Sequence, residues 1–167
     1  MNFKIKKKKK VLVTGGTGFI AGWIIKHLVE EGVTVHATVR DPDDKQKIAH
    51  LVKLSENNPG EIILFKADLL ERGSFNAAAK GCNIVFHTAS PFSFKFNDPV
   101  KDLINPALEG TKNVLETVNF TDSVERVVLT SSCAAIYGDA DECEHAPNNT
   151  LTEAIWNNTS SPSHQPY

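Results

Sequence analysis

A glycine-rich segment near the N-terminus has the residue types and spacing of a phosphate-binding turn. Small residues recur at every third position, Gly15, Gly18 and Ala21, between the apolar run Val11–Val13 and a helix predicted over 19–31. This spacing permits a tight turn, close approach of the backbone to a pyrophosphate, and close packing of the helix on the strand. Unpaired N–H groups at the helix start would attract the phosphate charge. The alternative is a connector that only needs flexible residues, and the absence of G-K-[ST] excludes a P-loop nucleotidase.

Basic residues follow the second predicted strand, where a dinucleotide-binding fold contacts the adenosine ribose. An acidic side chain at this place holds the 2′-hydroxyl of NAD, whereas an arginine suits the 2′-phosphate of NADP. Arg40 precedes Asp41, and Lys45 and Lys47 follow within reach. The segment therefore favours NADP over NAD, with solvated charges on a surface turn as the alternative.

The elements that must position these residues alternate along the chain. Apolar, β-branched runs predict strands at 11–13, 33–39, 62–65, 84–87 and 127–129. Helical spacing predicts helices at 19–31, 43–56, 74–79 and 98–118. This order, with continuous apolar strands, predicts an α/β fold with a doubly wound parallel sheet of the Rossmann type. Beyond residue 131 the alternation stops, and a long loop is expected.

The last predicted helix carries signals of its own. Asp98-Pro99 is typical of an N-cap followed by proline at the first helical position, and Pro106 is expected to kink the helix. Helical periodicity predicts an inward face made of Val100, Leu103, Ile104, Ala107, Thr111, Val114, Leu115 and Val118.

Charge is unevenly distributed along the 167 residues, which carry 18 Lys+Arg against 20 Asp+Glu for a net charge of −2. Six of the basic residues lie in the first ten positions, where there is no acidic residue. The remaining acidic body is a poor general binder of nucleic acid or of an anionic membrane. We expect residues 1–10 to be a disordered basic tail and 11–167 to be one domain.

Cysteine usage predicts a reducing cytoplasm. Three cysteines without a C-x-x-C pair, Cys82, Cys133 and Cys143, argue against a disulfide framework and a zinc site, and no metal is expected. No apolar run is long enough to span a bilayer. The apolar residues after Cys133 predict a buried thiol. His87 ends a predicted strand, where a hydrogen-bonded structural histidine is the favoured interpretation over an acid or base.

Six segments carry a family resemblance when they are taken in order. They are VLVTGGTGFIAGW, TVRDP, KADLL, VFHTASP, NPALEGTKNVLE and VVLTSSCAAIYGD. Together they resemble the extended short-chain dehydrogenase/reductases of the NAD-dependent epimerase/dehydratase family, in the branch that contains dihydroflavonol 4-reductase and cinnamoyl-CoA reductase. Ala21 departs from the third glycine of many relatives, but alanine still permits close packing.

The resemblance implies a role for each matching position. The pyrophosphate would be held by Gly15, Thr17, Gly18, Phe19 and Ile20. The 2′-phosphate would be held by Arg40 and Lys47. Asp68 and Leu69 would flank the adenine, and the nicotinamide ribose would be lined by Thr88, Ala89 and Ser90. The catalytic serine would be Ser132, and the catalytic tyrosine would be Tyr167, 35 residues further along.

In this family a tyrosine exchanges a proton with the substrate carbonyl or alcohol, and a lysine four residues later lowers its pKa. The serine hydroxyl orients the carbonyl and stabilises the charge that develops on its oxygen. The sequence reaches Tyr167 and does not include that lysine. The resemblance therefore implies the cofactor-binding half of an NADP-dependent oxidoreductase for an aldehyde or ketone, cut before its substrate-binding portion. The alternative is a non-catalytic dinucleotide-binding module.

Overall fold

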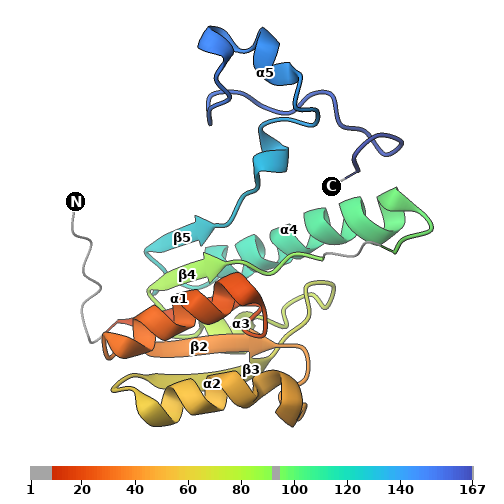
Figure 1. Ribbon diagram of the computed structural model, residues 1–167. Coiled ribbons are helices and arrows are strands. Elements are labelled where there is room, and N and C mark those ends of the chain that lie inside the picture. The colour runs from red at the N-terminus through yellow and green to blue at the C-terminus, as the bar shows by residue number, and fades with distance from the viewer. Residues whose placement is uncertain (1–8, 92–94, 167) are drawn as a thin grey trace. The chain divides into compact units, whose positions relative to one another are not determined.

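The computed structural model describes residues 9–91 and 95–166, which form two compact units (Figure 1). The described residues of the first unit are 9–90 and 109–129, and the second unit contains the rest. Most of the predicted basic tail and the predicted catalytic residue Tyr167 lie outside the described residues.

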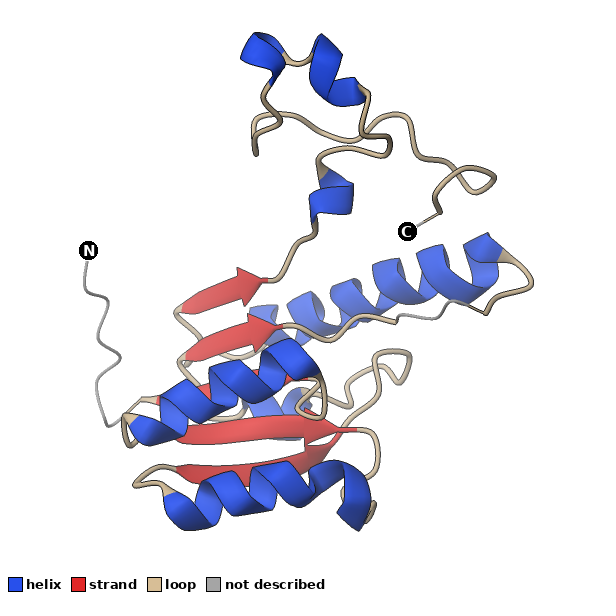
Figure 2. Cartoon of the chain, in the orientation of Figure 1, coloured by secondary structure: helices blue, strands red, loops and turns tan. Residues whose placement is uncertain are grey.

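The first unit is built on a five-stranded parallel sheet with the strand order β3-β2-β1-β4-β5 (Figure 2). The strands are β1 Lys10–Thr14, β2 Thr34–Val39, β3 Glu61–Lys66, β4 Ile84–His87 and β5 Arg126–Leu129. The chain runs outward from β1 to β3 and then returns to place β4 on the other side of β1. The order therefore reverses between β1 and β4, which makes the carboxyl ends of these two strands the topological switch point.

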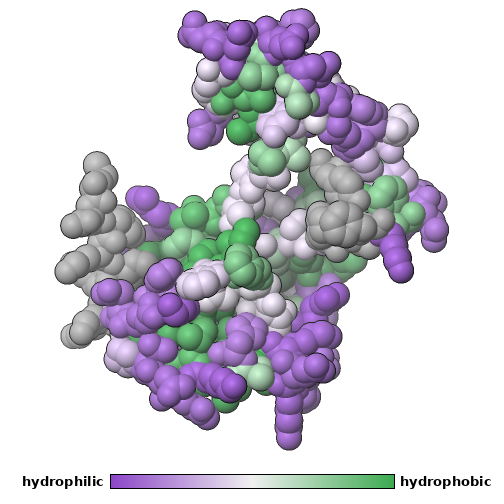
Figure 3. Space-filling view, in the orientation of Figure 1, coloured by the Kyte–Doolittle hydropathy of each residue, from purple (hydrophilic) through white to green (hydrophobic). Residues whose placement is uncertain are grey.

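Helices cover both faces of this sheet, as predicted. They are α1 Phe19–Glu30, α2 Lys45–Asn57, the short α3 Asn76–Ala79 and α4 Asn105–Asn119. Successive residues of β1 point to opposite faces, so Val11 and Val13 enter one core and Leu12 the other. The first core contains Ile25 of α1, and the second contains Val114 of α4. Hydrophilic residues dominate the lower part of the face in Figure 3, over the outer side of α2.

The predicted cap of the last helix is observed, and the hydrogen-bonding pattern of the helix changes next to Pro106. The Asp98 carboxylate accepts the N–H groups of Val100 and Lys101, at 3.0 and 3.1 Å. A π-helical turn over Val100–Ile104 comes first, and regular α-helix begins at Asn105, directly before Pro106. Proline has no N–H to donate to the carbonyl four residues earlier, so the hydrogen-bonding pattern changes at this point.

The predicted inward face of α4 is partly wrong. Leu103 and Val114 are buried as expected, whereas Val100, Ile104 and Leu115 are exposed. The helix packs instead through small and polar residues, Gly110, Asn113 and Thr117. A Cβ atom added to Gly110 would lie 2.8 Å from Cβ of Leu69, so the helix approaches this loop closely because it lacks a side chain there.

The second unit is largely loop beyond β5, as expected, with a 3₁₀ turn at Cys133–Ala135, the short helix α5 Glu142–His145 and a second 3₁₀ turn at Pro147–Asn149. The Glu142 carboxylate accepts the N–H groups of Gly138 and Asp139, at 2.9 and 2.8 Å, and so ties the loop to α5. The prediction of a buried Cys133 thiol is wrong, because this cysteine lies in a turn without buried residues and is exposed. No helix in the described part of the chain is long and apolar enough to cross a membrane.

Candidate cofactor site

The glycine-rich turn joins the carboxyl end of β1 to the start of α1, as predicted. Gly15 has a φ of +70°, in the left-handed region that favours glycine. Its N–H donates to the Thr38 hydroxyl at 3.2 Å, and the Gly16 N–H donates to the Thr38 carbonyl at 2.7 Å. Two backbone groups of the turn are therefore used to fix it to the end of β2.

The start of α1 remains free of side-chain caps. Its N-cap residue, Gly18, has an extended backbone and offers no side chain, and the first turn contains no acidic residue. Thr17, Gly18, Phe19 and Ile20 are all exposed. The first N–H groups of a helix have no intrahelical partner, and an uncapped helix start attracts an anion. The predicted residues thus come together at a place that fits a pyrophosphate.

The loop after β4 packs directly on this turn. A Cβ atom at Gly15 would lie 3.1 Å from Cα of Ala89, so the two backbones approach more closely than a side chain would permit. Thr88, Ala89 and Ser90, predicted to line the nicotinamide ribose, therefore extend from the switch point beside the phosphate turn.

A buried hydroxyl lies between β1 and β4. The Thr14 hydroxyl oxygen is 2.8 Å from Nδ1 of His87 and accepts the N–H groups of Thr88 and Ala89, at 3.1 and 3.0 Å. Thr14 and His87 are both buried, and burial lowers the pKa of His87. The interpretation of His87 as a hydrogen-bonded structural residue is confirmed.

The predicted 2′-phosphate residues follow the end of β2. Arg40 is exposed and forms no ion pair with an acidic group of the described residues. Lys47 is also exposed, but its ammonium group is 2.9 Å from the Asp44 carboxylate, which also accepts the Lys47 N–H as the cap of α2. This pair lowers the pKa of Asp44. Arg40 is consequently the cation that is more available to a ligand.

The predicted adenine residues lie in the loop after β3. The Asp68 carboxylate accepts the N–H of Leu70 at 2.9 Å, so one of its oxygens shapes the turn. Leu69 packs against Gly110, and its carbonyl accepts a hydrogen bond from the Asn113 amide at 3.0 Å. The loop is thereby held against α4 by backbone and side-chain contacts.

The predicted catalytic serine belongs to the second unit. Ser132 is exposed and is the N-cap of the 3₁₀ turn, where its hydroxyl oxygen accepts the Ala134 N–H at 3.2 Å. This is the backbone-capping role that a strand-end serine commonly has. A hydroxyl that accepts one hydrogen bond still has its proton to donate.

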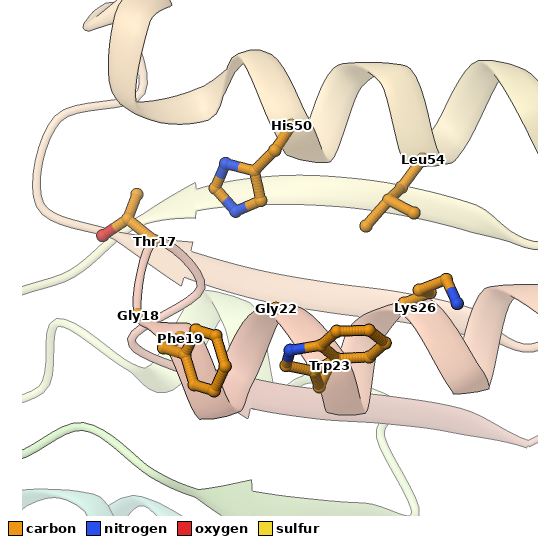
Figure 4. A pocket seen from close by; sticks show the side chains of 8 residues that line it. All are labelled: Thr17, Gly18, Phe19, Gly22, Trp23, Lys26, His50 and Leu54. Carbon is orange, nitrogen blue, oxygen red and sulfur yellow. The ribbon is translucent and has the colours of Figure 1, made fainter.

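A groove between α1 and α2 adjoins the phosphate turn (Figure 4). Phe19 and Trp23 form its wall on α1, with ring centroids 6.5 Å apart, and His50 and Leu54 face them from α2. The ammonium group of Lys26 lies 5.0 Å from the Trp23 ring centroid. The groove shares only Thr17, Gly18 and Phe19 with the predicted cofactor contacts, at the first turn of α1.

Sequence reasoning missed the two threonines that fix the site. Thr14 had a usable signal, since it directly precedes the glycines of the turn. Thr38 had none beyond its place near the end of a buried strand. Asn113, whose amide oxygen also accepts the Gly73 N–H at 2.9 Å, was missed as well.

The strand order, the turn at the switch point and the uncapped helix define a Rossmann-type, doubly wound dinucleotide-binding fold. The chain matches the model of the NAD dependent epimerase/dehydratase family over residues 11–163, and it belongs to that family.

Known proteins bear out the predicted branch of the family. A cinnamoyl-CoA reductase of Medicago truncatula is 52% identical over 126 residues, which cover 75% of this chain and 38% of that protein. An anthocyanidin reductase of Arabidopsis thaliana is 49% identical over 128 residues, covering 77% and 37%. The crystal structure of Gre2 from Candida albicans in complex with NADPH has a TM-score of 0.75 and 37% identity, covering 91% of this chain and 45% of that one. The chain thus spans less than half the length of each protein.

Proposed function

We propose that this chain is the cofactor-binding part of an NADP-dependent reductase that converts an aldehyde or ketone to an alcohol. The observation that carries the proposal is the uncapped, exposed start of α1 beside the positive-φ Gly15, at the switch point of a doubly wound sheet. The names of the related reductases and the NADPH complex of the Gre2 structure support it.

NADP is the proposed cofactor because of the charge that follows β2. Arg40 has the planar guanidinium group that suits a phosphate, and it is exposed where the adenosine ribose would lie. Lys47 would add a second positive charge, weakened by its Asp44 partner. Asp68 and Leu69 are assigned to the adenine, and Thr88, Ala89 and Ser90 to the nicotinamide ribose.

The bound cofactor would supply a hydride to the substrate carbonyl carbon. The Ser132 hydroxyl, whose oxygen already accepts the Ala134 N–H, would donate its proton in a hydrogen bond to the carbonyl oxygen. Tyr167 is proposed as the residue that gives this oxygen a proton. Cys82, Cys133 and Cys143 are free thiols, which supports a reducing cytoplasm as the working compartment.

The test is a fluorescence titration of the purified chain with NADPH and with NADH. We expect tighter binding of NADPH, and Arg40→Gln should weaken it about tenfold, since a hydrogen bond to a charged group contributes about 1.5–3 kcal/mol. The affinity for NADH should stay unchanged. Lys112→Gln is the control, because it also removes one exposed positive charge, at a position of α4 where Lys112 pairs with Glu109 at 2.9 Å and no cofactor contact is assigned. Equal affinities for the two cofactors would contradict the assignment.

A second measurement separates an enzyme from a binding module. We expect this chain alone to bind NADPH without substantial oxidation of it by simple aldehydes, as the sequence lacks the lysine four residues after Tyr167. A longer chain that contains the motif Y-x-x-x-K should oxidise NADPH in the presence of a carbonyl substrate. Binding without turnover in that longer chain would favour the non-catalytic module.

A further inference from the structure

Thr14 and His87 end two neighbouring strands and lie directly opposite each other in the β1–β4 register. Both side chains are buried, with exposed fractions of 0% for Thr14 and 1% for His87. Their polar atoms are 2.8 Å apart. A polar pair buried at the switch point of the sheet needs an explanation, because burial of polar groups is costly unless every hydrogen bond is made.

The direction of this hydrogen bond follows from counting the partners of the Thr14 hydroxyl. A hydroxyl has one proton and two acceptor lone pairs. Both lone pairs of Thr14 are used, because its oxygen accepts the N–H groups of Thr88 and Ala89. The Thr14 proton must therefore point to His87, and Nδ1 of His87 must be an unprotonated acceptor. Neutral His87 consequently has its proton on Nε2.

The same contacts join the loop after β4 to β1 from two sides. The Thr88 hydroxyl donates to the Thr14 carbonyl at 2.5 Å, while the Thr14 hydroxyl accepts the Thr88 N–H. The Thr14 hydroxyl also accepts the Ala89 N–H. At this place a Cβ atom added to Gly15 would contact Cα of Ala89. The Thr14 hydroxyl, together with that of Thr88, thus sets how closely the loop approaches the phosphate turn.

We propose that His87 is a positioning residue for cofactor binding, which acts by orienting the Thr14 hydroxyl so that this hydroxyl holds Thr88 and Ala89 against the Gly15 turn. The inference rests on the proposed function, because the ligand it concerns is NADPH. His87 would not touch the cofactor. Its nitrogen determines where the Thr14 proton points, and hence whether both lone pairs of that oxygen remain available to the loop.

Paired variants of the purified chain test this role by NADPH titration. Thr14→Val preserves the shape of the side chain and removes the hydroxyl, so two N–H groups lose their acceptor, and we expect about tenfold weaker NADPH binding. Thr14→Ser restores the hydroxyl and should bind within about twofold of the native chain. His87→Phe should weaken binding like Thr14→Val, whereas His87→Asn, which offers an acceptor oxygen near the position of Nδ1, should recover most of the affinity.

Urea unfolding of each variant separates positioning from folding. A folded Thr14→Val chain that binds NADPH as tightly as Thr14→Ser would overturn the proposal. If Thr14→Val or His87→Phe does not fold, the comparison of His87→Asn with the native chain still decides. Native-like affinity is expected for His87→Asn, and an affinity about tenfold weaker would overturn the proposal.

A third measurement does not depend on the cofactor. Nitrogen-15 NMR of the native chain should show His87 with unprotonated Nδ1 and protonated Nε2, and the opposite tautomer would overturn the hydrogen-bond assignment. Absence of NADPH binding by the native chain, with this tautomer present, would instead refute the proposed function, and the positioning role with it. The two failures are therefore distinguishable.

Discussion

Replacing Gly15 with alanine tests the geometry of the phosphate turn most directly. Gly15 has a φ of +70°, a conformation that costs a residue with a side chain about 1–2 kcal/mol. The added Cβ would also lie 3.1 Å from Cα and 3.2 Å from Cβ of Ala89. Carbon atoms pack favourably at about 3.5–4.0 Å, so the Ala89 loop would have to move away.

The consequences for stability and for binding can be estimated separately. Backbone strain alone should lower the free energy of unfolding by about 1–2 kcal/mol. Movement of the loop puts at risk the two hydrogen bonds from Thr88 and Ala89 to Thr14, each worth about 0.5–1.5 kcal/mol. We therefore expect Gly15→Ala to be less stable by about 2–5 kcal/mol in all. NADPH binding should weaken at least about fivefold, the equivalent of the strain by itself.

Urea unfolding and NADPH titration of the same samples are the assays, and Gly22→Ala is the control. Gly22 lies inside α1, and a Cβ atom there would come no closer than 3.8 Å to the His50 ring. Alanine at that helix position should raise stability by up to about 1 kcal/mol and leave the NADPH affinity unchanged. The reasoning is refuted if Gly15→Ala unfolds within about 0.5 kcal/mol of the native chain, the range of ordinary surface substitutions.

Three other predictions follow from packing and titration. Because burial lowers the pKa of His87, its neutral form is favoured in the folded chain. Stability should be full above about pH 6.5 and fall as the pH drops below it, and urea unfolding of His87→Asn should show a flatter pH profile. Gly110→Ala, whose Cβ would lie 2.8 Å from Cβ of Leu69, should destabilise the chain by about 1–3 kcal/mol in the same assay. Burial raises the pKa of the Cys82 thiol to about 11, so a thiol reagent at neutral pH should label exposed Cys133 and spare Cys82 until the chain is unfolded.

The parallel sheet could be predicted because its strands are buried on both faces. Val11, Leu12, Val13 and Val35 have no exposed surface, and such strands appear in a sequence as continuous apolar runs. The helices between them follow from helical spacing and, for the last one, from the Asp98-Pro99 cap signal. The observed ends of the strands differ from the predicted ends by at most one residue. The first strand, for example, begins at Lys10, within the predicted tail.

The packing face of α4 could be predicted only in part, because it is not wholly apolar. Hydrophobic periodicity points to Ile104 and Leu115, which are exposed, whereas Gly110, Asn113 and Thr117 are buried beside Val114. Asn113 is buried because its amide donates to the carbonyls of Leu69 and Glu71 and accepts the Gly73 N–H. Those partners lie some 40 residues earlier in the chain, and no local pattern encodes them.

Different residues of the phosphate turn have different roles: some fix its shape, and others keep their N–H groups available. The spacing of the glycines alone does not reveal this. The N–H groups of Gly15, Gly16 and Gly18 all donate within the protein, to the Thr38 hydroxyl, the Thr38 carbonyl and the Gly15 carbonyl. These glycines therefore shape the turn and do not offer their N–H groups to a ligand. The N–H groups of Thr17, Phe19 and Ile20, at the exposed start of α1, are the ones that the proposed pyrophosphate would use.

Because Gly15 and Gly16 of the turn donate to Thr38, side chains far away in the sequence affect the shape of the site. Thr38 and the Thr14–His87 pair come from three different strands, and each holds one side of the turn. Thr14 and His87 are 73 positions apart, so only the parallel pairing of β1 and β4 brings them together. A change in either hydroxyl should therefore impair phosphate binding as surely as a change in a glycine, although neither hydroxyl would touch the phosphate.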